Sequence, residues 1–525
     1  MNNIPEEEVK TEYQVAADKV KAKITISQKH EDYVPTYAVS YPHFEEPTQA
    51  VLDKIREEVT DEIEVEGKEM LDPKAIKEIK SRFLETSEEI VRKYLPKLPE
   101  EKALTLAGRL THQMYGLGPV EILLKDDDLE EIVINSSDEP VWVYHKEYGW
   151  LKTDIQLESE DKIYNFSSII GRRVGKQITN LQPLMDAHLV SGDRVNATLF
   201  PVSTQGNTIT IRKFARNPWT ITHFIDPEFG TLSKEIASLL WISMQYEMNL
   251  IIAGGTASGK TALLNTLVPF IPPTQRIITI EDTRELNLPQ YLHWVPMTTR
   301  EPNPEGKGEV KMLDLMVNSL RMRPDRIIVG EIRRKKQAEV LFEAMLTGHS
   351  VYSTLHANTA QEVKRRMTNP PVDIPESMLE SLHLTCVQYR DRRTGIRRTR
   401  ELAEVIPKAK RRGEGFDVNV NVLYKWDPDT DTFSQARESS RLIEEIKTHT
   451  GMKEREIKQD LKEKQRILQW MLDNNLKTVN SVGKIVADYY KDKGRILELV
   501  QEDKSPDKIL NENLIKELKK RGFRE

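Results

Sequence analysis

Residues 251–267, IIAGGTASGKTALLNTL, carry the clearest chemical pattern in the chain. Gly254, Gly259, Lys260 and Thr261 match the spacing G-x-x-x-x-G-K-[ST], which predicts a loop that binds the phosphates of ATP or GTP. Glycines let successive backbone N–H groups converge on phosphate oxygens, and the following helix points its positive end at the same anion. We expect Lys260 to reach the β and γ phosphates and the Thr261 hydroxyl to ligate Mg²⁺.

The whole loop is the candidate nucleotide site. The predicted metal ligand is Thr261, and the predicted nucleotide-binding residues are Gly254, Gly255, Thr256, Ala257, Ser258, Gly259, Lys260, Thr261 and Ala262. An apolar run that indicates a strand precedes the loop, and a run that indicates a helix comes after it. This is the structural context that the pattern requires.

Two later segments place carboxylates at the ends of predicted strands. Glu281 and Asp282 follow RIITI, and Glu331 follows RIIVG. Ligands of open α/β sheets bind at the carboxyl ends of the strands, so these acids are suited to hold Mg²⁺ through water or to orient an attacking water. The alternative for each is an acidic residue in a solvated turn.

Two histidines, His349 and His356, flank another strand-like run, SVYSTL. An imidazole beside the phosphates can donate to a phosphate oxygen or couple the site to a neighbouring domain. The alternative is a structural role for either ring.

Composition limits the class of protein. The chain has 525 residues, which predicts two to four domains, and a net charge of −6, which argues against a protein that binds polyanions over its whole surface. A single cysteine, Cys386, excludes an internal disulfide and a cysteine-cluster zinc site. No run of about 18 apolar residues predicts a transmembrane helix. We expect a cytoplasmic protein that can still contact a membrane through an embedded partner.

Helices and strands alternate after residue 231, which predicts a parallel sheet covered on both faces and an α/β fold. The preceding region mixes strand-like runs with a predicted helix near 160–173. The expected organisation is a polar arm and helical region at 1–115, an α+β domain at 116–215, a linker at 216–230, a P-loop domain at 231–437 and a charged helical extension at 438–525. Within the linker, Trp219 and Phe224 could lie against adenine or pack the hinge.

Four segments together resemble a known family. GGTASGKT, IEDTRELNLP, RMRPDRIIVGEIR and EAMLTGHSVYSTLHANTA, in this order, resemble the Walker A, Asp box, Walker B and His box of the type II/IV secretion ATPases. Upstream, YGLGPVEILLKDDDLEEIVIN resembles the N-terminal domain of the same family. The resemblance covers residues 100–405 approximately and implies a C-terminal RecA-like P-loop ATPase domain behind an α+β N-terminal domain.

The resemblance also implies a mechanism. Members form hexameric rings that bind ATP with Mg²⁺ between subunits and between the two domains of each subunit. By position, Glu331 serves hydrolysis, Glu281 supports it, and His349 and His356 line the site. Arginines of the N-terminal domain act on the γ phosphate, and the matching residues are Arg194 and Arg212. The implied partners are a polytopic membrane platform protein and filament accessory proteins, at the inner face of the cell membrane.

The segments after the four boxes indicate the subfamily. Many bacterial members carry a four-cysteine zinc element there, which one cysteine cannot form. The segment DRRTGIRRTRELAEVIP and the helical tail are more similar to archaeal members, namely the motor of the archaeal flagellum (archaellum) and related archaeal type IV pilus ATPases. The predicted function is therefore an ATPase that powers such a filament or related secretion.

Two rival functions remain at this point. One is a ring ATPase that translocates nucleic acid, as in conjugation or DNA uptake, but the acidic charge and the lack of aromatics interleaved with basic residues argue against nucleic acid as a partner. The other is a nucleotide-gated scaffold without catalysis, against which the intact Lys260, Thr261 and Glu331 argue. Six arginines in residues 390–400 predict either a patch for an anionic partner or a solvated or intersubunit surface.

Overall fold

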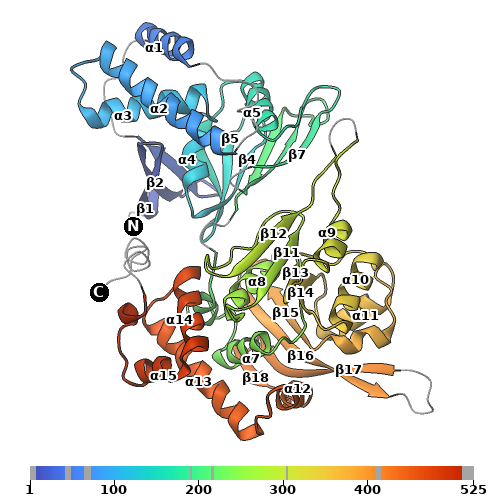
Figure 1. Ribbon diagram of the computed structural model, residues 1–525. Helices are drawn as coiled ribbons and strands as arrows, with labels where there is room; N and C mark the ends of the chain where they lie inside the picture. The colour runs from blue at the N-terminus through green and yellow to red at the C-terminus, as the bar shows by residue number, and fades with distance from the viewer. Residues whose placement is uncertain are drawn as a thin grey trace. The chain divides into compact units, whose positions relative to one another are not determined.

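The computed structural model describes residues 7–41, 49–63, 73–189, 192–214, 218–302, 306–409 and 416–510. The chain divides into two compact units (Figure 1). The first is Met1–Ala215 with Asn303–Glu305, and the second is Arg216–Pro302 with Gly306–Glu525. Each unit contains its own nine-stranded sheet. Among the helices of the described ranges, none is both long enough and apolar enough to cross a bilayer.

The sheet of the first unit has the strand order β1-β2-β3-β6-β5-β4-β9-β8-β7. Its strands are β1 Glu7–Ala17, β2 Val20–Lys29, β3 Thr36–Ser40, β4 Leu129–Ile134, β5 Pro140–His145, β6 Gly149–Gln156, β7 Leu184–His188, β8 Arg194–Thr198 and β9 Thr208–Arg212. The helix predicted near 160–173 is α5, Glu160–Arg173.

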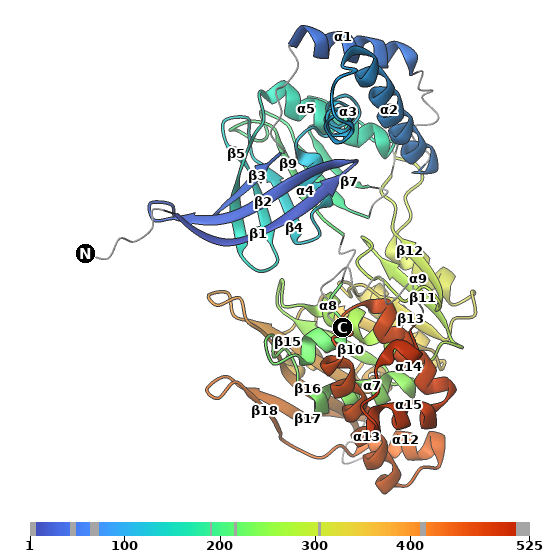
Figure 2. The ribbon, with the colours of Figure 1, turned by 90° about the vertical axis from the view of Figure 1, so that its left-hand side faces the viewer.

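The expected polar arm at the start of the chain is wrong for residues 7–40, which form the long strands β1 and β2 and the short strand β3 (Figure 2). Along β2, Val20, Ala22, Ile24 and Ile26 are buried, while the residues between them, 21, 23 and 25, are exposed or half-buried. This period of two is the signature of a strand with one covered face. The many lysines and glutamates between the apolar residues hid that signature when the composition was judged as a whole.

Helices α1 Gln49–Glu62, α2 Pro73–Tyr94 and α3 Glu100–Met114 form the predicted helical region. Their apolar residues make a separate small core that includes Ile55, Val59, Ile79 and Leu110. The short helix α4, Val120–Lys125, comes next. The buried residues of these helices recur at the spacing of three and four that is typical of an amphipathic helix.

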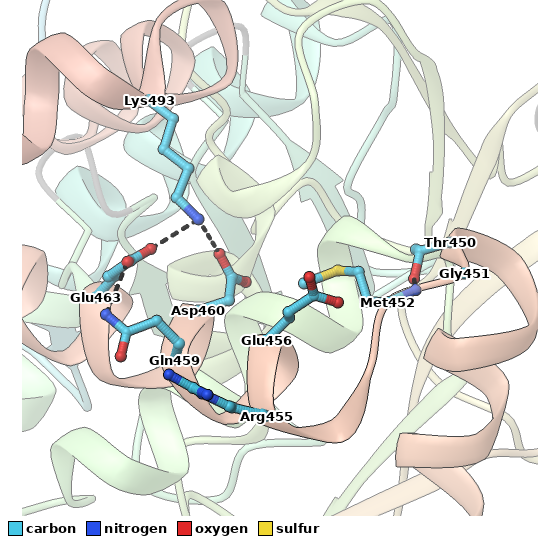
Figure 3. Close-up of a pocket in the computed structure, with 9 residues that line it drawn as sticks. All are labelled: Thr450, Gly451, Met452, Arg455, Glu456, Gln459, Asp460, Glu463 and Lys493. Atoms are coloured by element: carbon cyan, nitrogen blue, oxygen red, sulfur yellow. Dashed lines mark hydrogen bonds and ion pairs between the residues drawn. The ribbon is translucent and has the colours of Figure 1, made fainter.

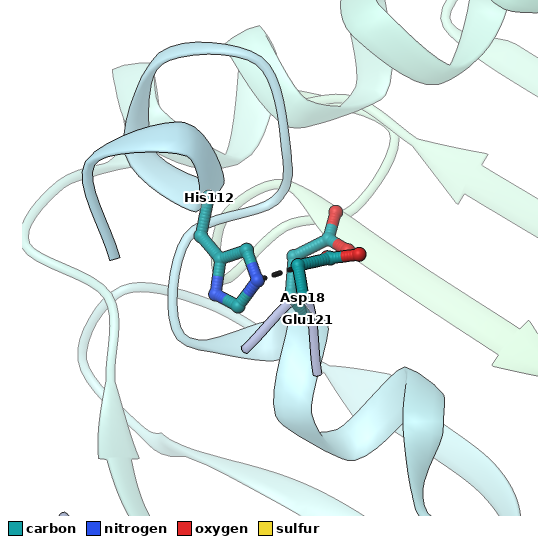
Figure 4. Close-up of side chains that lie close together, drawn as sticks. All are labelled: Asp18, His112 and Glu121. Carbon is teal, nitrogen blue, oxygen red and sulfur yellow. Dashed lines mark hydrogen bonds and ion pairs between the residues drawn. The ribbon is translucent and has the colours of Figure 1, made fainter. Parts of the chain in front are cut away.

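A charged cluster joins these helices to the β1–β2 turn. Figure 4 shows His112 of α3 beside Asp18 of the turn and Glu121 of α4. The ammonium of Lys80 on α2 lies 2.7 Å from Asp18 Oδ2 and 2.8 Å from Glu121 Oε2. Burial opposes ionisation of Asp18, but hydrogen bonds from His112 and Lys80 outweigh it and hold the Asp18 pKa below its ordinary value. Asp18, His112 and Glu121 are residue types that can ligate a metal ion. Here the Lys80 ammonium already supplies a positive charge to the two carboxylates, so we assign the cluster a structural role.

The sheet of the second unit has the order β12-β11-β13-β14-β10-β15-β16-β17-β18. The strands are β10 Leu250–Gly254, β11 Arg276–Glu281, β12 His293–Thr298, β13 Arg326–Val329, β14 Ser350–Leu355, β15 Leu384–Arg390, β16 Arg397–Ala409, β17 Phe416–Asp427 and β18 Thr432–Gln435. The first six in the order are parallel, and the last three are added antiparallel. The order β11-β13-β14-β10-β15 is that of a RecA-like P-loop domain, which confirms the predicted fold class.

Helices cover both faces of this sheet, as the alternation predicted (Figure 1). Leu250 and Ile252 of β10 belong to one core, and Ile251 and Ala253 belong to the other, each fully buried. The first core contains α7 Lys234–Gln245 and α8 Lys260–Leu267. The second contains α9 Met312–Ser319, α10 Lys335–Leu346 and α11 Ala360–Thr368. Because helices cover both faces of the sheet, a ligand reaches β10 at its carboxyl end, where the strand leads into the loop.

The expected linker and the C-terminal extension belong to the first of these cores. Residues 221–225 form α6, Ile221–Ile225, and Phe224 is buried there, so it packs rather than lying open to adenine. The extension consists of α12 Arg441–Thr450, α13 Glu454–Asp473, α14 Val479–Lys491 and α15 Lys493–Gln501. The Thr222 hydroxyl donates to the Leu476 carbonyl at 2.8 Å, so the extension is bonded directly to α6.

A charged groove lies where the turn between α12 and α13 meets α15 (Figure 3). Lys493 points into it and lies 2.7 Å from both Asp460 Oδ1 and Glu463 Oε2 on α13. Behind it, the buried Lys464 pairs with Asp460, and burial lowers the Lys464 pKa to about 8. Lys493 therefore holds the start of α15 on α13 through these two acids.

Candidate active site at the phosphate loop

The loop between β10 and α8 needs glycine at two positions. Gly259 has φ +91°, and it caps α8 in the left-handed conformation. A Cβ on Gly254 would overlap Ser258 Oγ and lie 2.5 Å from the carbonyl oxygen of Gln388 on the adjacent β15. The turn therefore closes against its neighbouring strand only because residue 254 has no side chain.

The interior of the loop is held by hydrogen bonds to one carbonyl group. The Ser258 hydroxyl donates to the Gly255 oxygen at 2.9 Å, and the Lys260 ammonium donates to the same oxygen at 2.8 Å. Burial lowers the Lys260 pKa, and the nearby Glu331 and Glu285 partly oppose this. The first amides of α8 have no acceptor within the helix. A partly desolvated ammonium and a helix N-terminus on a glycine turn fit a phosphate group.

Glu331 follows β13 at the same edge of the sheet and is held by two donors. Its Oε1 lies 3.0 Å from Nε2 of His356, which directly follows β14. Its Oε2 accepts from Nε of Arg333 at 2.8 Å. The same guanidinium donates to Asp282 Oδ2 at 3.0 Å, beyond the end of β11. Three neighbouring parallel strands thus deliver one connected group of ionic side chains.

The proton on His356 can be assigned from its partner. Burial lowers the His356 pKa, Lys260 lowers it further, and Glu331 opposes the shift. A neutral imidazole carries one N–H, and the Glu331 carboxylate can only accept, so Nε2 carries the proton and donates. Two donors leave acceptor capacity on both oxygens of Glu331, so the carboxylate is oriented without being saturated.

Arg333 belongs to the candidate site, but the sequence did not indicate it. It lies two residues after Glu331 in GEIR, among several arginines and lysines, and nothing in its spacing distinguishes it from a solvated charge. The side chain is 62% exposed, yet it bridges Glu331 and Asp282. Only the adjacency of β11 and β13 brings these two acids within reach of one guanidinium.

Glu281 is buried, in contrast to the solvated turn acid that was the alternative. Its Oε1 accepts from the backbone N–H groups of Glu285 at 2.9 Å and Leu286 at 3.1 Å. Its Oε2 is buried and has no hydrogen-bond partner among the described residues. Burial raises the Glu281 pKa to about 7. The side chain therefore fixes the loop after β11, and its second oxygen is left for a further donor or a cation.

The residues at this edge suit Mg²⁺. The Thr261 hydroxyl in the first turn of α8 and the carboxylates of Glu281 and Asp282 are oxygen donors, which Mg²⁺ prefers. The orphaned Glu281 Oε2 is buried and would gain from such a charge. The donor set therefore fits the predicted metal.

The burial of Glu281 predicts a pH dependence of stability. The unfolded chain ionises this carboxyl near pH 4.3–4.5, whereas the folded chain keeps it protonated up to about pH 7. The free energy of unfolding should therefore fall as pH rises through this window, by roughly 3 kcal/mol in all, and then level off. Urea unfolding of wild type and Glu281→Gln at pH 5 and pH 8 checks this. The variant should lack this loss, and equal losses in both proteins would show that Glu281 ionises normally.

His349 is not brought to this edge. It precedes β14, whereas His356 follows it, and the two ends of the strand are roughly 20 Å apart at 3.3 Å per residue. The backbone N–H of His349 donates to the Ala344 carbonyl at 3.0 Å, closing the turn after α10. Because β14 runs parallel to β10, the site edge receives only His356.

Arg194 and Arg212 belong to the first unit, where they are direct neighbours. They face each other across β8 and β9, and both are exposed. Arg194 also forms a two-pronged ion pair with Asp186, with Nε 3.1 Å from Oδ1. The first unit therefore presents two guanidinium groups side by side on one face of its sheet.

The C-terminal extension contacts the loop that Glu281 fixes. The N–H of Gln290 donates to Asn480 Oδ1 at 3.3 Å. A Cβ on Gly483 of α14 would lie 2.7 Å from Pro289 and 2.7 Å from the Tyr291 hydroxyl. Residues 286–291 are thus held between the Glu281 carboxylate at one end and α14 at the other.

The fold and this group of residues define a P-loop ATPase of the RecA-like class. The family model described as "Type II/IV secretion system protein" matches residues 116–389, just over half of the chain. The chain therefore belongs to that family, and it is an ATPase of the type II/IV secretion class, as its motifs predicted.

Two relatives and one solved structure illustrate the similarity. An uncharacterized protein of Methanocaldococcus jannaschii is 34% identical over 389 residues, covering 73% of this chain and 69% of that protein. The type IV secretion system protein PtlH of Bordetella pertussis is 30% identical over 265 residues, covering 47% of this chain and 77% of PtlH. The ATPase DotB of Legionella pneumophila is 19% identical with a TM-score of 0.39, covering 72% of this chain and 93% of DotB.

Proposed function

We propose that this protein is a hexameric ATPase that converts ATP hydrolysis into motion of its two units. The motion powers assembly, or rotation, of an archaeal type IV pilus-like filament or archaellum, or a related secretion step. The observation that carries the proposal is the connected group at one sheet edge: the loop 254–261 and a Glu331 carboxylate oriented by two donors. Membership of the secretion family and an archaeal relative support the biological setting.

Each residue of the group has a role in this proposal. Lys260 and the amides of the loop bind the β and γ phosphates. Glu331 orients the attacking water and accepts its proton, while Arg333 and His356 hold its two oxygens. Thr261 and the carboxylates of Glu281 and Asp282 at the end of β11 would hold Mg²⁺, which neutralises phosphate charge when bound.

The arginine pair of the first unit completes the site in trans. Arg194 and Arg212 lie directly opposite each other on neighbouring strands, so two exposed guanidinium groups stand side by side on that face, and Asp186 orients the first of them. Planar guanidinium groups suit the charge that develops on a transferring phosphoryl group. We assign them to the γ phosphate of a nucleotide bound by the neighbouring subunit.

The partners follow from the same proposal. A ring of identical subunits acts on a polytopic membrane platform protein and on filament accessory proteins. It does so in the cytoplasm, peripherally at the inner face of the cell membrane. We expect no nucleic acid among the partners.

Mixing two inactive variants tests the ring. ATP turnover is measured for wild type over a range of protein concentrations, and for an equimolar mixture of Lys260→Ala and Arg212→Ala. If Arg212 acts across a subunit boundary, specific activity rises with concentration. The mixture should then regain up to about a quarter of wild-type activity, because half of the loops and half of the arginines are intact in a head-to-tail ring.

Two results would contradict the proposal. Activity that is independent of concentration, with no recovery on mixing, means that Arg212 acts within its own chain or not at all. Stimulation of turnover by DNA in the same assay would favour the nucleic-acid motor instead.

A further inference from the structure

Arg397, in the arginine-rich segment 390–400, bonds to the phosphate loop. Its Nε donates to the carbonyl of Ala257 at 3.3 Å, and its Cδ would lie 3.7 Å from a Cβ on Gly259. In the described ranges, its other guanidinium nitrogens have no hydrogen-bond partner. Arg397 therefore keeps free donors beside the loop that binds phosphate.

The rest of the segment has other uses, so the arginines are not one uniform patch. Arg398, the next residue of β16, is buried and forms a two-pronged pair with Asp431, with 2.7 Å for each contact. Arg393 lies exposed in the turn between β15 and β16. Successive residues of a strand point to opposite faces, which explains why Arg397 and Arg398 differ.

The order of the strands in the sheet indicates which end of a bound nucleotide would lie next to Arg397. β10 has β14 and then β13 on one side, and β15 and then β16 on the other. Glu331 and His356 follow β13 and β14, so the hydrolysed end of a bound nucleotide lies on that side of the loop. Arg397 begins β16, opposite Arg390 at the carboxyl end of β15, on the other side of the same edge.

We propose that Arg397 binds the nucleoside half of the nucleotide, through the sugar oxygens and the face of the base. A guanidinium offers five donors in one plane and also stacks on aromatic rings, so it suits both parts. ATP and ADP have the same nucleoside, so Arg397 contributes to the affinity for both nucleotides and not to the rate of hydrolysis. This inference rests on the proposed nucleotide site at residues 254–261.

Three ligands separate this role from the alternatives. Affinities for ATP, ADP and inorganic tripolyphosphate, each with Mg²⁺, are measured by competition against a fluorescent ADP for the full-length wild type, Arg397→Ala, Arg397→Lys and Arg393→Ala. We expect Arg397→Ala to bind ATP and ADP about 10- to 100-fold more weakly, the range for a lost hydrogen bond to a charged group. Its affinity for tripolyphosphate and its kcat at saturating ATP should stay within about 2-fold of wild type.

Two control variants test whether the loss of affinity is specific to the guanidinium of Arg397. Arg393→Ala removes the same charge from the exposed turn and should match wild type, while Arg397→Lys should recover only part of the affinity because lysine lacks the planar fork. Equal weakening of ATP and tripolyphosphate would overturn the inference, because Arg397 would then act on the loop or the phosphates. Unchanged affinity for ATP and ADP would also overturn it. If wild type itself binds none of the ligands, the proposed nucleotide site fails as well.

Discussion

Replacing Glu331 by glutamine should lower kcat for ATP about 100- to 10,000-fold, the range for loss of a general base. The change keeps the shape of the side chain and one acceptor oxygen for either His356 or Arg333, but it removes the carboxylate that accepts the proton. Nucleotide binding should change by less than about 3-fold, because the loop 254–261 is untouched. Steady-state phosphate release and equilibrium binding of ADP measure the two quantities separately.

The matched control is Glu343→Gln, an exposed glutamate on α10 in the same unit. It removes the same charge without approaching the loop and should leave kcat unchanged. If Glu331→Gln turned over ATP at the wild-type rate, neither the charge nor the basicity of Glu331 would be needed, and the catalytic role would belong to another residue of the edge.

Gly254→Ala should lower kcat/KM for ATP roughly 100-fold or more, as expected when a binding loop is displaced by about 1 Å. The new methyl group would overlap Ser258 Oγ and lie 2.5 Å from the backbone oxygen of Gln388. The hydroxyl can turn away, but the carbonyl belongs to a buried strand of the sheet and cannot. The loop must therefore move away from β15, and its amides move with it. ATP turnover across a substrate range, with ADP affinity, checks this.

Gly255→Ala is the informative comparison. A Cβ there would lie 3.6 Å from Asn358 Oδ1, which is ordinary contact, and the backbone does not have the left-handed conformation. The loss of kcat/KM should be much smaller than for Gly254→Ala, although both changes add one methyl group to the same loop. Equal losses would mean that methyl bulk anywhere in the loop, rather than the packing of Gly254 on β15, decides activity.

The sequence alone determined the features that depend on neighbours along the chain. The spacing of Gly254, Gly259, Lys260 and Thr261 defined the loop, because a phosphate-binding turn is built from consecutive backbone groups. The alternation of apolar strands and helices defined the parallel sheet with two covered faces. The order of the four boxes identified the family, which the match over residues 116–389 confirmed.

Some assignments failed because a motif does not show direction in space. His349 and His356 flank the same strand, and the resemblance to the secretion ATPases implied that both line the site. A strand separates its two ends by about 3.3 Å per residue, so only the histidine at the carboxyl end of β14 reaches Glu331. The N-terminal strands were missed because residues 7–40 were judged by their polar average, although residues 20–27, VKAKITIS, alternate between apolar and polar side chains.

Only the tertiary structure decided the partners of the charged residues. Arg333 joins Glu331 to Asp282, although 51 residues separate it from that aspartate. Arg397 bonds to Ala257 across 140 residues, and Arg194 faces Arg212 across a strand pair. The burial that raises the Glu281 pKa is likewise a property of the assembled core. Local pattern is set by bonds between neighbours in sequence, whereas charge interactions depend on distance and burial, which the packing of strands and helices creates.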